Sequence, residues 1–547
     1  MNNLRVVMAQ QGFEIGDISG NVQKIIQLTQ AAFQDQQVDL LLFPELCLIG
    51  YPPEDLLLRP SLKLRINEAI ELLLQANLPC AIVIGVPMTI DGQLFNSAIC
   101  ISENKIIHQY HKQCLPNYQV FDEKRYFTMG EQSSVFEFKG VMFSLLICED
   151  IWLDEPIIKA KDLGAQVVLT LNASPFHLNR VAQRLKRIEV IAKQHELIVF
   201  YVNGHYAQDE LVFDGASFVV NQQGQLTHSC DQFVDVMAIV DLSVNKKAKI
   251  NQVDVLKNGS TAKELSLMQS LHQALVLGLK SYVNKNGFPG IVLGLSGGID
   301  SGLSLAIAVD ALGADRVHAV MMPFEYTSEM SIKDAKEQAD LLGVKFDIVP
   351  IVDIYESTYK TLQPVLGLDQ PGVTEQNLQS RIRGVMLMAI SNKTGSMVLT
   401  TGNKSEMAVG YATLYGDMCG GYNALKDVPK TLVFELSRFL NTIKPSIPAR
   451  VIERPPSAEL APDQKDEDTL PPYEILDAII EFYVEQDLSA EEIVEQGFEK
   501  ETVYWVCKQI DRNEFKRQQS AEGVRITPRG FGKDRRYPIT HKWIAGI

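Results

Sequence analysis

The chain has 547 residues, of which 46% are hydrophobic and 22% are charged, and its formal net charge is −16. These fractions are those of soluble globular proteins and exclude a collagen-like or largely disordered chain. No apolar run reaches the ~20 residues that a membrane-spanning helix needs. The net negative charge argues against a general nucleic-acid binder.

The cysteine pattern gives no sign of a disulfide framework or a zinc site. Eight cysteines are present, none of them in a CxxC pair and none in a cluster with zinc-ligand spacing. The opening stretch MNNLRVVMAQ is typical of a strand rather than of an export signal. We therefore expect reduced thiols and a cytoplasmic protein, without contacts to nucleic acid or membrane.

Residues 1–245 alternate short apolar segments with amphipathic ones. The helices are predicted at 20–34 and 178–194, and a hairpin is predicted over 213–230. The strands are predicted at 4–9, 38–43, 81–86, 141–148, 167–171 and 197–202. This mixture predicts a layered α/β domain in which some strands pair antiparallel.

The polar stretch 246–264 loses this periodicity and is expected to be a linker to a second domain over 265–547. That domain opens with a βαβαβ pattern, which favours a doubly wound parallel sheet with ligands at the carboxyl ends of its strands. Its elements are predicted at 290–293, 302–312, 317–322, 332–342 and 345–351. The stretch 453–472 is rich in proline and acidic residues, and we expect a mobile loop there.

Three polar residues each follow an apolar strand of the first domain: Glu45, Lys112 and Cys148. A thiol that attacks an amide needs a base for its proton and a cation for the oxyanion, and this set supplies both. Lys112 would also favour the thiolate. Taken singly, the cysteine is better explained as a core residue, Lys112 as a solvated strand-end charge and Glu45 as a helix N-cap partner.

The segments HKQCLPNYQVFDEKRYF (111–127) and CEDIW (148–152) resemble the glutaminase branch of the nitrilase/amidase superfamily. The resemblance implies a nitrilase-like αββα sandwich with Glu45 as base, Lys112 as oxyanion stabiliser and Cys148 as nucleophile. It also implies a glutamine-binding set made of Tyr118, Glu123, Glu149, Ser174 and Arg180, in which Glu123 acts as a supporting carboxylate.

A glycine-rich turn, GLSGGIDS (294–301), lies between a strand and a helix of the second domain. Its glycines let backbone amides meet a phosphate chain at a helix N-terminus, and Asp300 is a candidate magnesium ligand. No lysine follows, so this is not the phosphate loop of kinases and GTPases. A glycine-rich turn alone would be weak evidence.

The SGGIDS turn resembles the loop of ATP-pyrophosphatases, and the segments 397–417, 427–441 and 513–538 resemble the synthetase domain of glutamine-dependent NAD⁺ synthetases. The resemblance implies a Rossmann-like domain of the adenine nucleotide α-hydrolase type and magnesium at Asp300 and Glu406. It implies ATP contacts at Gly294, Leu295, Ser296, Gly297, Gly298, Ile299, Asp300, Ser301, Met322, Thr401 and Lys430. It implies deamido-NAD contacts at Asn377, Glu406, Asp417 and Lys516.

Together the two halves imply ATP-dependent amidation of deamido-NAD⁺ with ammonia from L-glutamine, in a homo-oligomer in which Lys516 serves its own or a neighbouring site. Two alternatives stay open: amidation of a different acceptor, and a non-catalytic scaffold that retains both folds. The stretch 512–536 holds eight Lys/Arg against three Asp/Glu, which favours a surface for an anionic dinucleotide.

Overall fold

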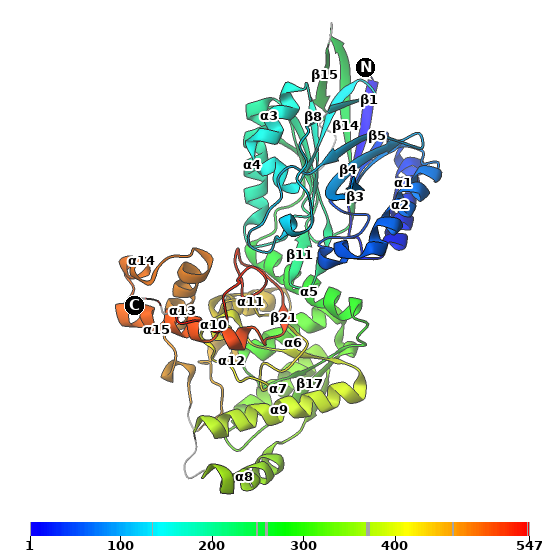
Figure 1. The fold of residues 1–547 in the computed structure, drawn as a ribbon. Coiled ribbons are helices and arrows are strands. Elements are labelled where there is room, and N and C mark those ends of the chain that lie inside the picture. Colours follow the sequence, from blue (N-terminus) through cyan, green and yellow to red (C-terminus); the bar gives the residue numbers. More distant parts are fainter. Residues whose placement is uncertain are drawn as a thin grey trace. The chain divides into compact units, whose positions relative to one another are not determined.

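The computed structural model describes residues 2–133, 135–247, 250–256, 261–367, 372–461, 464–543 and 545. It divides into two compact units, drawn as a ribbon in Figure 1. The first unit is Met1–Tyr206 with Val212–Ser266, and the second is Ala207–Leu211 with Leu267–Ile547. The hairpin β10–β11 (His205–Gln208 and Leu211–Asp214) therefore contributes its turn to the second unit.

The first unit holds a seven-stranded mixed sheet in the order β15-β14-β1-β2-β3-β4-β5. β1 is parallel to β2 and antiparallel to β14, so strands near both ends of this unit's sequence meet at the middle of the sheet. The bounds are β1 Asn2–Gln10, β2 Leu40–Leu42, β3 Ala81–Ile90, β4 Gln93–Ser102, β5 Lys105–His111, β14 Val236–Lys247 and β15 Ile250–Val255.

A second, six-stranded sheet in the order β13-β12-β9-β8-β7-β6 faces the first. Its three central strands β7, β8 and β9 are parallel and almost wholly buried, as continuous apolar strands covered on both faces are. The bounds are β6 Val135–Phe138, β7 Val141–Ile147, β8 Val167–Asn172, β9 Ile198–Asn203, β12 Phe218–Val220 and β13 Leu226–Ser229.

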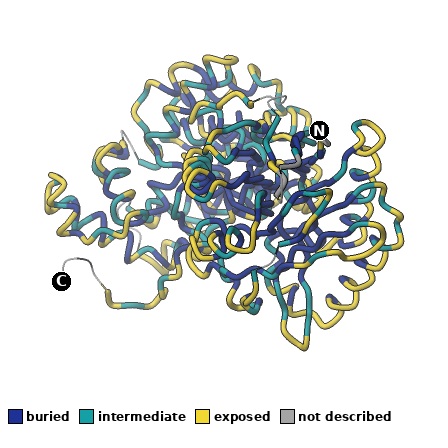
Figure 2. The backbone as a smooth tube through the Cα atoms, turned by 90° about the horizontal axis from the view of Figure 1, so that it is seen from above, coloured by how far each residue is buried: buried dark blue, intermediate teal, exposed yellow. Residues whose placement is uncertain are grey.

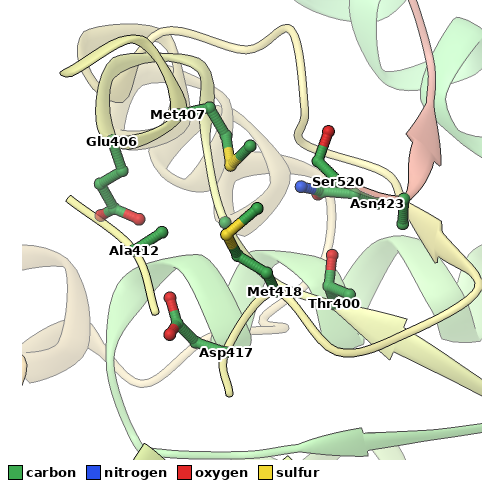
Figure 3. Close-up of a pocket in the computed structure, with 10 residues that line it drawn as sticks. Thr400, Glu406, Met407, Ala412, Asp417, Met418, Asn423 and Ser520 are labelled. Atoms are coloured by element: carbon green, nitrogen blue, oxygen red, sulfur yellow. The ribbon is translucent and has the colours of Figure 1, made fainter. Parts of the chain in front are cut away.

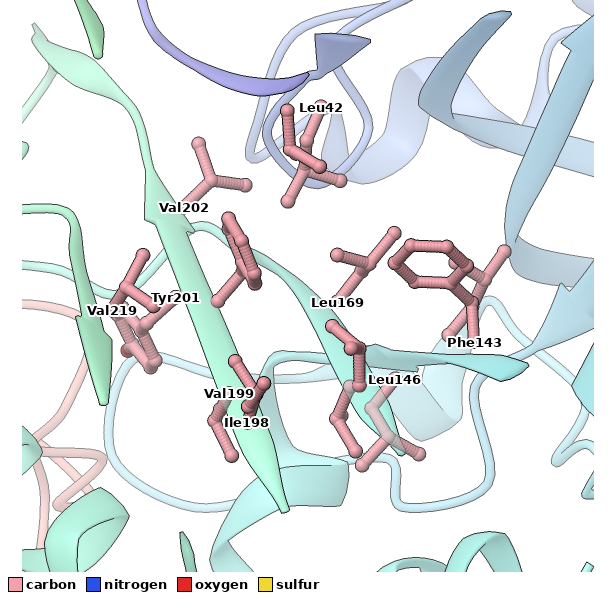
Figure 4. Close-up of a cluster of buried hydrophobic side chains, with 14 of the residues drawn as sticks. Leu42, Phe143, Leu146, Leu169, Ile198, Val199, Tyr201, Val202 and Val219 are labelled. Atoms are coloured by element: carbon pink, nitrogen blue, oxygen red, sulfur yellow. The ribbon is translucent and has the colours of Figure 1, made fainter. Parts of the chain in front are cut away.

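Side chains of both sheets form one apolar core. Figure 4 shows Leu42 of the first sheet beside Leu169 and Val202 of the second within this cluster. Helices cover the outer faces, α1 and α2 on one side and α3 and α4 on the other, which makes an αββα sandwich (Figure 1). The helices are α1 Ile18–Gln36, α2 Pro60–Gln75, α3 Asp154–Asp162 and α4 Arg180–His195, with short 3₁₀ turns η1 Glu54–Leu58, η2 Glu123–Arg125 and η3 Cys148–Trp152.

The second unit is built on a parallel six-stranded sheet in the order β18-β17-β16-β19-β20-β21. The chain runs outward from β16 to β18 and returns to β19, so the strand order reverses between β16 and β19. Such a switch point is where doubly wound sheets bind ligands. The bounds are β16 Ile291–Gly294, β17 Val317–Met321, β18 Lys345–Ile348, β19 Met397–Thr400, β20 Tyr422–Asn423 and β21 Glu522–Gly523.

Helices α5, α6 and α11 pack together, while α9 packs against β16 and β19. The helices around the sheet are α5 Leu267–Lys285, α6 Ile299–Leu312, α7 Glu329–Leu342, α8 Val352–Leu366, α9 Val373–Thr394, α10 Lys404–Val409, α11 Lys430–Ile443 and α12 Ala449–Glu453. The C-terminal helices have an apolar core of their own and are α13 Tyr473–Ile480, α14 Ala490–Glu495, α15 Lys500–Arg512 and α16 Glu514–Arg517. Short turns complete this unit: η4 Ala314–Arg316, η5 Asp466–Asp468 and η6 Glu481–Glu485. In Figure 2 buried backbone lies inside and exposed residues follow the outer faces of helices.

Both fold predictions are confirmed, and the predicted strands and helices appear with ends shifted by a few residues. The polar stretch 246–264 differs from its expected role as a linker, because β15 adds to the edge of the first sheet by pairing with β14. Pairing with a neighbouring strand overrode the polar composition there. Among the described residues, no helix is long and apolar enough to cross a membrane.

Two candidate active sites

The structure brings Glu45 and Lys112 into contact and places Cys148 beside them. Glu45 lies in the turn after β2, Lys112 directly follows β5, and Cys148 begins η3 at the end of β7. These positions are strand ends of the two facing sheets, and they bring the three polar side chains together at the margin of the core. All three residues are buried.

Lys112 is the centre of this charge cluster. Its Nζ lies 2.8 Å from Oε1 of Glu45 and 2.8 Å from Oε1 of Glu123. Burial opposes its charge, but Glu123 and Glu45 outweigh that and hold the pKa of Lys112 well above its ordinary value. Burial, with the nearby charge of Glu45, raises the pKa of Glu123 to about 7, although Lys112 opposes this.

Cys148 is held as a thiol at rest. Burial and the charge of Glu45 raise the pKa of Cys148 well above its ordinary value, and the opposing charge of Lys112 does not reverse this. Lys112 therefore favours the thiolate, as expected, but burial and the nearby carboxylates have the larger effect on the pKa of Cys148. The proton must leave during the attack, which requires an adjacent base such as Glu45.

Asp150 fixes the turn that carries the cysteine. Cys148 has the left-handed φ of +45°, an uncommon conformation for a residue other than glycine. Two residues on, Asp150 is buried and accepts hydrogen bonds from the backbone N–H of Ile147 (3.0 Å) and of Cys114 (2.8 Å). One carboxylate thus ties the nucleophile's turn to the segment that follows Lys112.

The predicted glutamine-binding residues surround the cysteine, with one exception. The Tyr118 hydroxyl donates to Glu149 at 2.9 Å, and the Arg180 guanidinium lies 4.4 Å from the centre of the Trp152 ring. Burial and the neighbouring Arg184 lower the pKa of Arg180. Glu123 is the exception: it is buried beneath Lys112 and accepts from the Tyr51 hydroxyl at 3.2 Å, so it belongs to the catalytic charge cluster.

Ser174 is oriented by groups that sequence reasoning missed. Its Oγ accepts from Nε of the fully buried Arg184 at 3.1 Å, and its backbone N–H donates to Asn203 at 2.9 Å. Arg184 in turn pairs with buried Asp214 at 2.7 Å. Because the Ser174 oxygen already accepts, its hydroxyl proton can be donated to a substrate oxygen.

The loop 294–301 lies at the switch point of the second unit's sheet, directly after β16. Gly297 has a φ of +80°, and a Cβ there would lie 2.4 Å from the carbonyl oxygen of Ser331, so no larger residue fits. The Ser301 hydroxyl bonds Ser296 at 3.0 Å and closes the loop. Gly298 caps α6, so the loop ends at a helix N-terminus that favours anions.

Lys430 lies between the two predicted metal ligands. Its Nζ is 2.5 Å from Oδ2 of Asp300 and 3.1 Å from Oε1 of Glu406. Burial, reinforced by Asp300, raises the pKa of Glu406 to about 8 against the charge of Lys430. Asn403 donates to Asp300 at 2.9 Å and accepts from the Glu406 N–H at 2.9 Å, which ties the two carboxylates together.

A pocket opens beside this pair (Figure 3). Its described lining is Thr400, Gly402, Glu406, Met407, Ala412, Asp417, Met418, Asn423, Ser520 and Ala521. Glu406 and Asp417 are thus brought to one pocket, whereas Thr400 rather than the predicted Thr401 lines it. Met407 and Met418 point toward one another in its middle (Figure 3).

Three further predicted residues lie near this unit's site. Asn377 accepts from the Thr413 hydroxyl at 2.8 Å, and Lys516 donates to the carbonyl of Ala412, a lining residue, at 2.9 Å. Burial lowers the pKa of Lys516. Met322 packs beside Gly294, and its carbonyl accepts from Arg383 at 3.0 Å.

The comparisons with known proteins agree with this geometry. A family model described as carbon-nitrogen hydrolase matches residues 4–251, and one described as NAD synthase matches residues 271–520. A glutamine-dependent NAD(+) synthetase from Acinetobacter baylyi is 46% identical over 99% of both chains. The chain belongs to the glutamine-dependent NAD(+) synthetase family. It is accordingly an enzyme.

Two other members of this family are also similar to the chain over its whole length. The synthetase from Xylella fastidiosa strain 9a5c is 44% identical over 99% of both chains. A solved structure of the synthetase from Acinetobacter baumannii, in complex with adenosine diphosphate, has a TM-score of 0.79 and 45% identity, and covers all of both chains.

Three arginines of the basic stretch 512–536 form ion pairs within the protein, so the charge count overstates the charge that this stretch can offer to a dinucleotide. Buried Arg525 pairs with Asp534 at 2.8 Å and Arg517 pairs with Glu514 at 2.8 Å, while Arg529 pairs with Asp487. These arginines hold the C-terminal segment in place. Glu514 and Asp534 belong to the same stretch and Asp487 lies outside it, and a charge count does not show which charges pair.

The described part of 453–472 makes contacts that its composition does not reveal. Arg454 donates to the carbonyl of Gly297 and, at 3.0 Å, to the Ser331 hydroxyl. Glu459 accepts from the Ser331 hydroxyl at 2.7 Å. Farther along, buried Asp466 accepts from the Tyr473 hydroxyl at 2.8 Å. This segment therefore packs against the phosphate loop, while residues 462 and 463 lie outside the described residues.

Proposed function

We propose that this enzyme amidates deamido-NAD⁺ to NAD⁺ with ammonia from L-glutamine, and that ATP, as co-substrate, is split to AMP and pyrophosphate. The observation that carries the proposal is the presence, on one chain, of an assembled Glu45–Lys112–Cys148 cluster and a pyrophosphatase-type loop with its two carboxylates. Residues 1–245, together with the end of β14 and with β15 (Ile250–Val255), are assigned as the glutaminase domain, and residues 265–547 as the synthetase domain. The free thiols of the described chain fit a cytoplasmic enzyme.

In the glutaminase reaction, the Cys148 sulfur attacks the side-chain amide carbon of glutamine while Glu45 takes the thiol proton. Lys112 stabilises the oxyanion, and its Nζ is already fixed by two carboxylates, so little reorganisation is needed. Glu45 then gives the proton to the leaving nitrogen, ammonia departs, and water hydrolyses the thioester to glutamate.

The zwitterionic end of glutamine calls for one acid and one base near the cysteine. Glu149, which accepts from Tyr118, faces the α-ammonium group, and Arg180 on its Trp152 platform faces the α-carboxylate. Ser174 donates its hydroxyl proton to the same carboxylate. Burial of Arg180 makes an anionic partner favourable, since the guanidinium makes no ion pair among the described side chains.

In the synthetase reaction, the nicotinate carboxylate of deamido-NAD⁺ attacks the α-phosphorus of ATP and pyrophosphate leaves, which gives a mixed anhydride. Ammonia attacks its carbonyl carbon and AMP departs. Backbone amides of 294–301 and the N-terminus of α6 bind the phosphates, with Lys430 close by. Thr401 and Met322 are assigned to ATP, and Asn377, Glu406, Asp417 and Lys516 to deamido-NAD⁺.

The residues present fit a magnesium ion. Asp300 and Glu406 supply hard oxygen ligands and both reach one cation, because Lys430 contacts the two at once. When bound there, Mg²⁺ would neutralise charge on the departing pyrophosphate. The assembly state is assigned as a homo-oligomer on family resemblance. The bonds of Lys516 to Gly410 and Ala412 support a role in its own chain's site.

A comparison of nitrogen donors tests this division of labour. Cys148→Ala is expected to abolish glutamine-driven NAD⁺ formation and to spare synthesis from added ammonium. Asp300→Ala is expected to stop both. The assay follows glutamate, AMP and NAD⁺ together, with deamido-NAD⁺ offered against nicotinate and other carboxylic acids. Loss of both activities in Cys148→Ala, or equal use of another acid, would contradict the proposal.

A further inference from the structure

The Glu45 carboxylate is held by three donors that differ in kind. Its Oε1 accepts from Nζ of Lys112 at 2.8 Å and from Nδ2 of Asn96 at 2.8 Å. Its Oε2 accepts from the backbone N–H of Ala173 at 3.0 Å. A carboxylate oxygen has about two acceptor positions, so Oε1 is fully used and Oε2 keeps one position open.

Asn96 is placed so that its amide group must donate to Glu45. It lies on β4, is 1% exposed, and its backbone carbonyl accepts from the Lys112 N–H at 2.8 Å. An ionised carboxylate can only accept, so the Nδ2 group is the one that faces Glu45. The opposite atom, Oδ1, is buried and has no hydrogen-bond partner among the described residues.

An unpaired buried acceptor is unfavourable, and asparagine at this position therefore does not serve stability alone. A leucine, whose side chain branches at the same atom, would leave no unpaired oxygen. Within the described part of the chain, the one polar contact that this side chain makes is the bond to Glu45. This bond gives the Glu45 carboxylate a neutral donor. The other side-chain donor to Glu45 is Lys112, which also donates to Glu123.

We propose that Asn96 is a positioning residue for Glu45. The Asn96 amide occupies Oε1 of Glu45, so that the proton of the Cys148 thiol is taken at Oε2 of Glu45. The inference rests on the proposed role of Glu45 as the base. The Nδ2–H bond fixes the rotation of the carboxylate. The titratable and charged groups that face Glu45 are Lys112, Glu123, Cys148, Tyr51 and Tyr206.

Two substitutions separate the donor from the volume. Asn96→Asp is isosteric and replaces the donor with a second carboxylate, and Asn96→Leu removes the donor without adding charge. The matched control is Asn221→Asp, the same change at a buried asparagine whose Oδ1 accepts two backbone N–H groups in the β12–β13 turn. Each protein is assayed for glutaminase kcat and KM from pH 5.5 to 9, and for ammonium-driven NAD⁺ synthesis.

We expect the acid limb of the glutaminase pH profile to move to higher pH in both Asn96 variants, by about one unit or more in Asn96→Asp and less in Asn96→Leu. At pH 7 this lowers kcat by about tenfold in Asn96→Asp, with little change in KM. Activity recovers at higher pH. Ammonium-driven synthesis stays within about twofold of the parent in both variants, and Asn221→Asp leaves both activities unchanged.

An unmoved pH profile in both variants, or an equal loss at every pH, would overturn the proposal. If Asn96→Asp also loses ammonium-driven synthesis, the Asn96→Leu protein decides whether the fold or the glutaminase site is affected. Loss of ammonium-driven synthesis in both variants would mean that the fold itself needs the asparagine, and this would overturn the positioning role. The Glu45→Gln variant separates failure of the proposed base, Glu45, from failure of the positioning role of Asn96. If Glu45→Gln keeps glutaminase activity, the assignment of the base fails. If it loses that activity while the Asn96 variants keep the parent profile, only the positioning role fails.

Discussion

The two candidate sites share one device, a buried lysine between two carboxylates, and use it in different ways. In the glutaminase cluster, Lys112, Glu45 and Glu123 have side-chain exposures of 0%, 0% and 6%. In the synthetase cluster, Lys430 is 1% exposed, but Asp300 and Glu406 keep 19% and 17%. The first cluster is closed and the second faces its pocket.

This difference follows from the chemistry that each lysine serves. An oxyanion forms at one fixed atom, so Lys112 is held rigidly and its counter-charges are permanent parts of the cleft. Phosphates bind and leave together with a metal ion, so the synthetase site must admit a second cation. Lys430 holds the carboxylates of Asp300 and Glu406 together while the site stays open to that cation. A closed ion cluster is expected to tolerate no exchange of its cation, whereas the open one should.

The largest effect is expected for Lys112→Met. Two carboxylates would be buried without their cation, which costs about 3–5 kcal/mol of unfolding free energy. Glutamine-driven synthesis should fall by about 10²–10³-fold or more from loss of the oxyanion partner. Thermal unfolding and glutaminase assays measure both, with Lys105→Met, an exposed lysine on β5, as the matched control. An unchanged unfolding midpoint would show that Lys112 is not the counter-charge of this cluster.

Lys430→Met should reveal the exchangeable character of the second cluster. Without its lysine, the Asp300–Glu406 pair repels itself, and Mg²⁺ at millimolar concentration should raise the unfolding temperature of the variant a few degrees more than that of the parent. The measurement is a thermal shift with MgCl₂ and no nucleotide.

The Lys112→Met protein is the control for Lys430→Met, since its buried cluster should not respond to magnesium. Equal magnesium responses in all three proteins would contradict the distinction between a closed and an open cluster. Pyrophosphate release by Lys430→Met should also fall, by about 10²-fold, because a phosphate-side cation is lost.

The sequence predicts the strand ends of the sites well where a catalytic residue follows an uninterrupted apolar strand. Glu45 and Cys148 are found this way, whereas Lys112 follows the largely exposed strand β5 and is found through its resemblance to a family motif. The switch point between β16 and β19 follows from the βαβαβ pattern. The partners of these residues are harder to predict. Asn96 and Arg184 lie within elements whose pattern indicates only burial or an amphipathic helix, so nothing local marks their polar contacts.

Charge counting fails for a different reason. Arg517, Arg525 and Arg529 form a basic run in the sequence, yet each finds an acidic partner in the folded chain. Likewise, the position of Glu123 beneath Lys112 depends on how the segment after β5 folds back, which Asp150 controls from the end of β7. Such pairings depend on tertiary structure and cannot be read from composition.

The smallest effect concerns Glu210, a buried carboxylate that forms no ion pair with a lysine among the described residues. It is 4% exposed, and its Oε1 accepts the backbone N–H of Lys533, at 3.1 Å. Burial and the charges of Asp534 and Glu522 raise the pKa of Glu210 to about 7. The charge of Lys426 opposes this shift without reversing it, so Glu210 shows what a buried carboxylate costs without the bonded cation that both sites possess.

The pH dependence of stability follows from that shift. A carboxyl group whose folded pKa exceeds its unfolded value stabilises the fold fully below the unfolded pKa, and that contribution disappears as pH rises through the folded pKa near 7. Glu210→Gln should therefore equal the parent near pH 4 and exceed its unfolding free energy by about 1–3 kcal/mol at pH 8. Chemical denaturation at the two pH values measures this. If the Glu210→Gln protein were more stable than the parent by the same amount at both pH values, Glu210 would not be neutralised in the fold, and burial without a cation would be less costly here than the two lysine clusters imply.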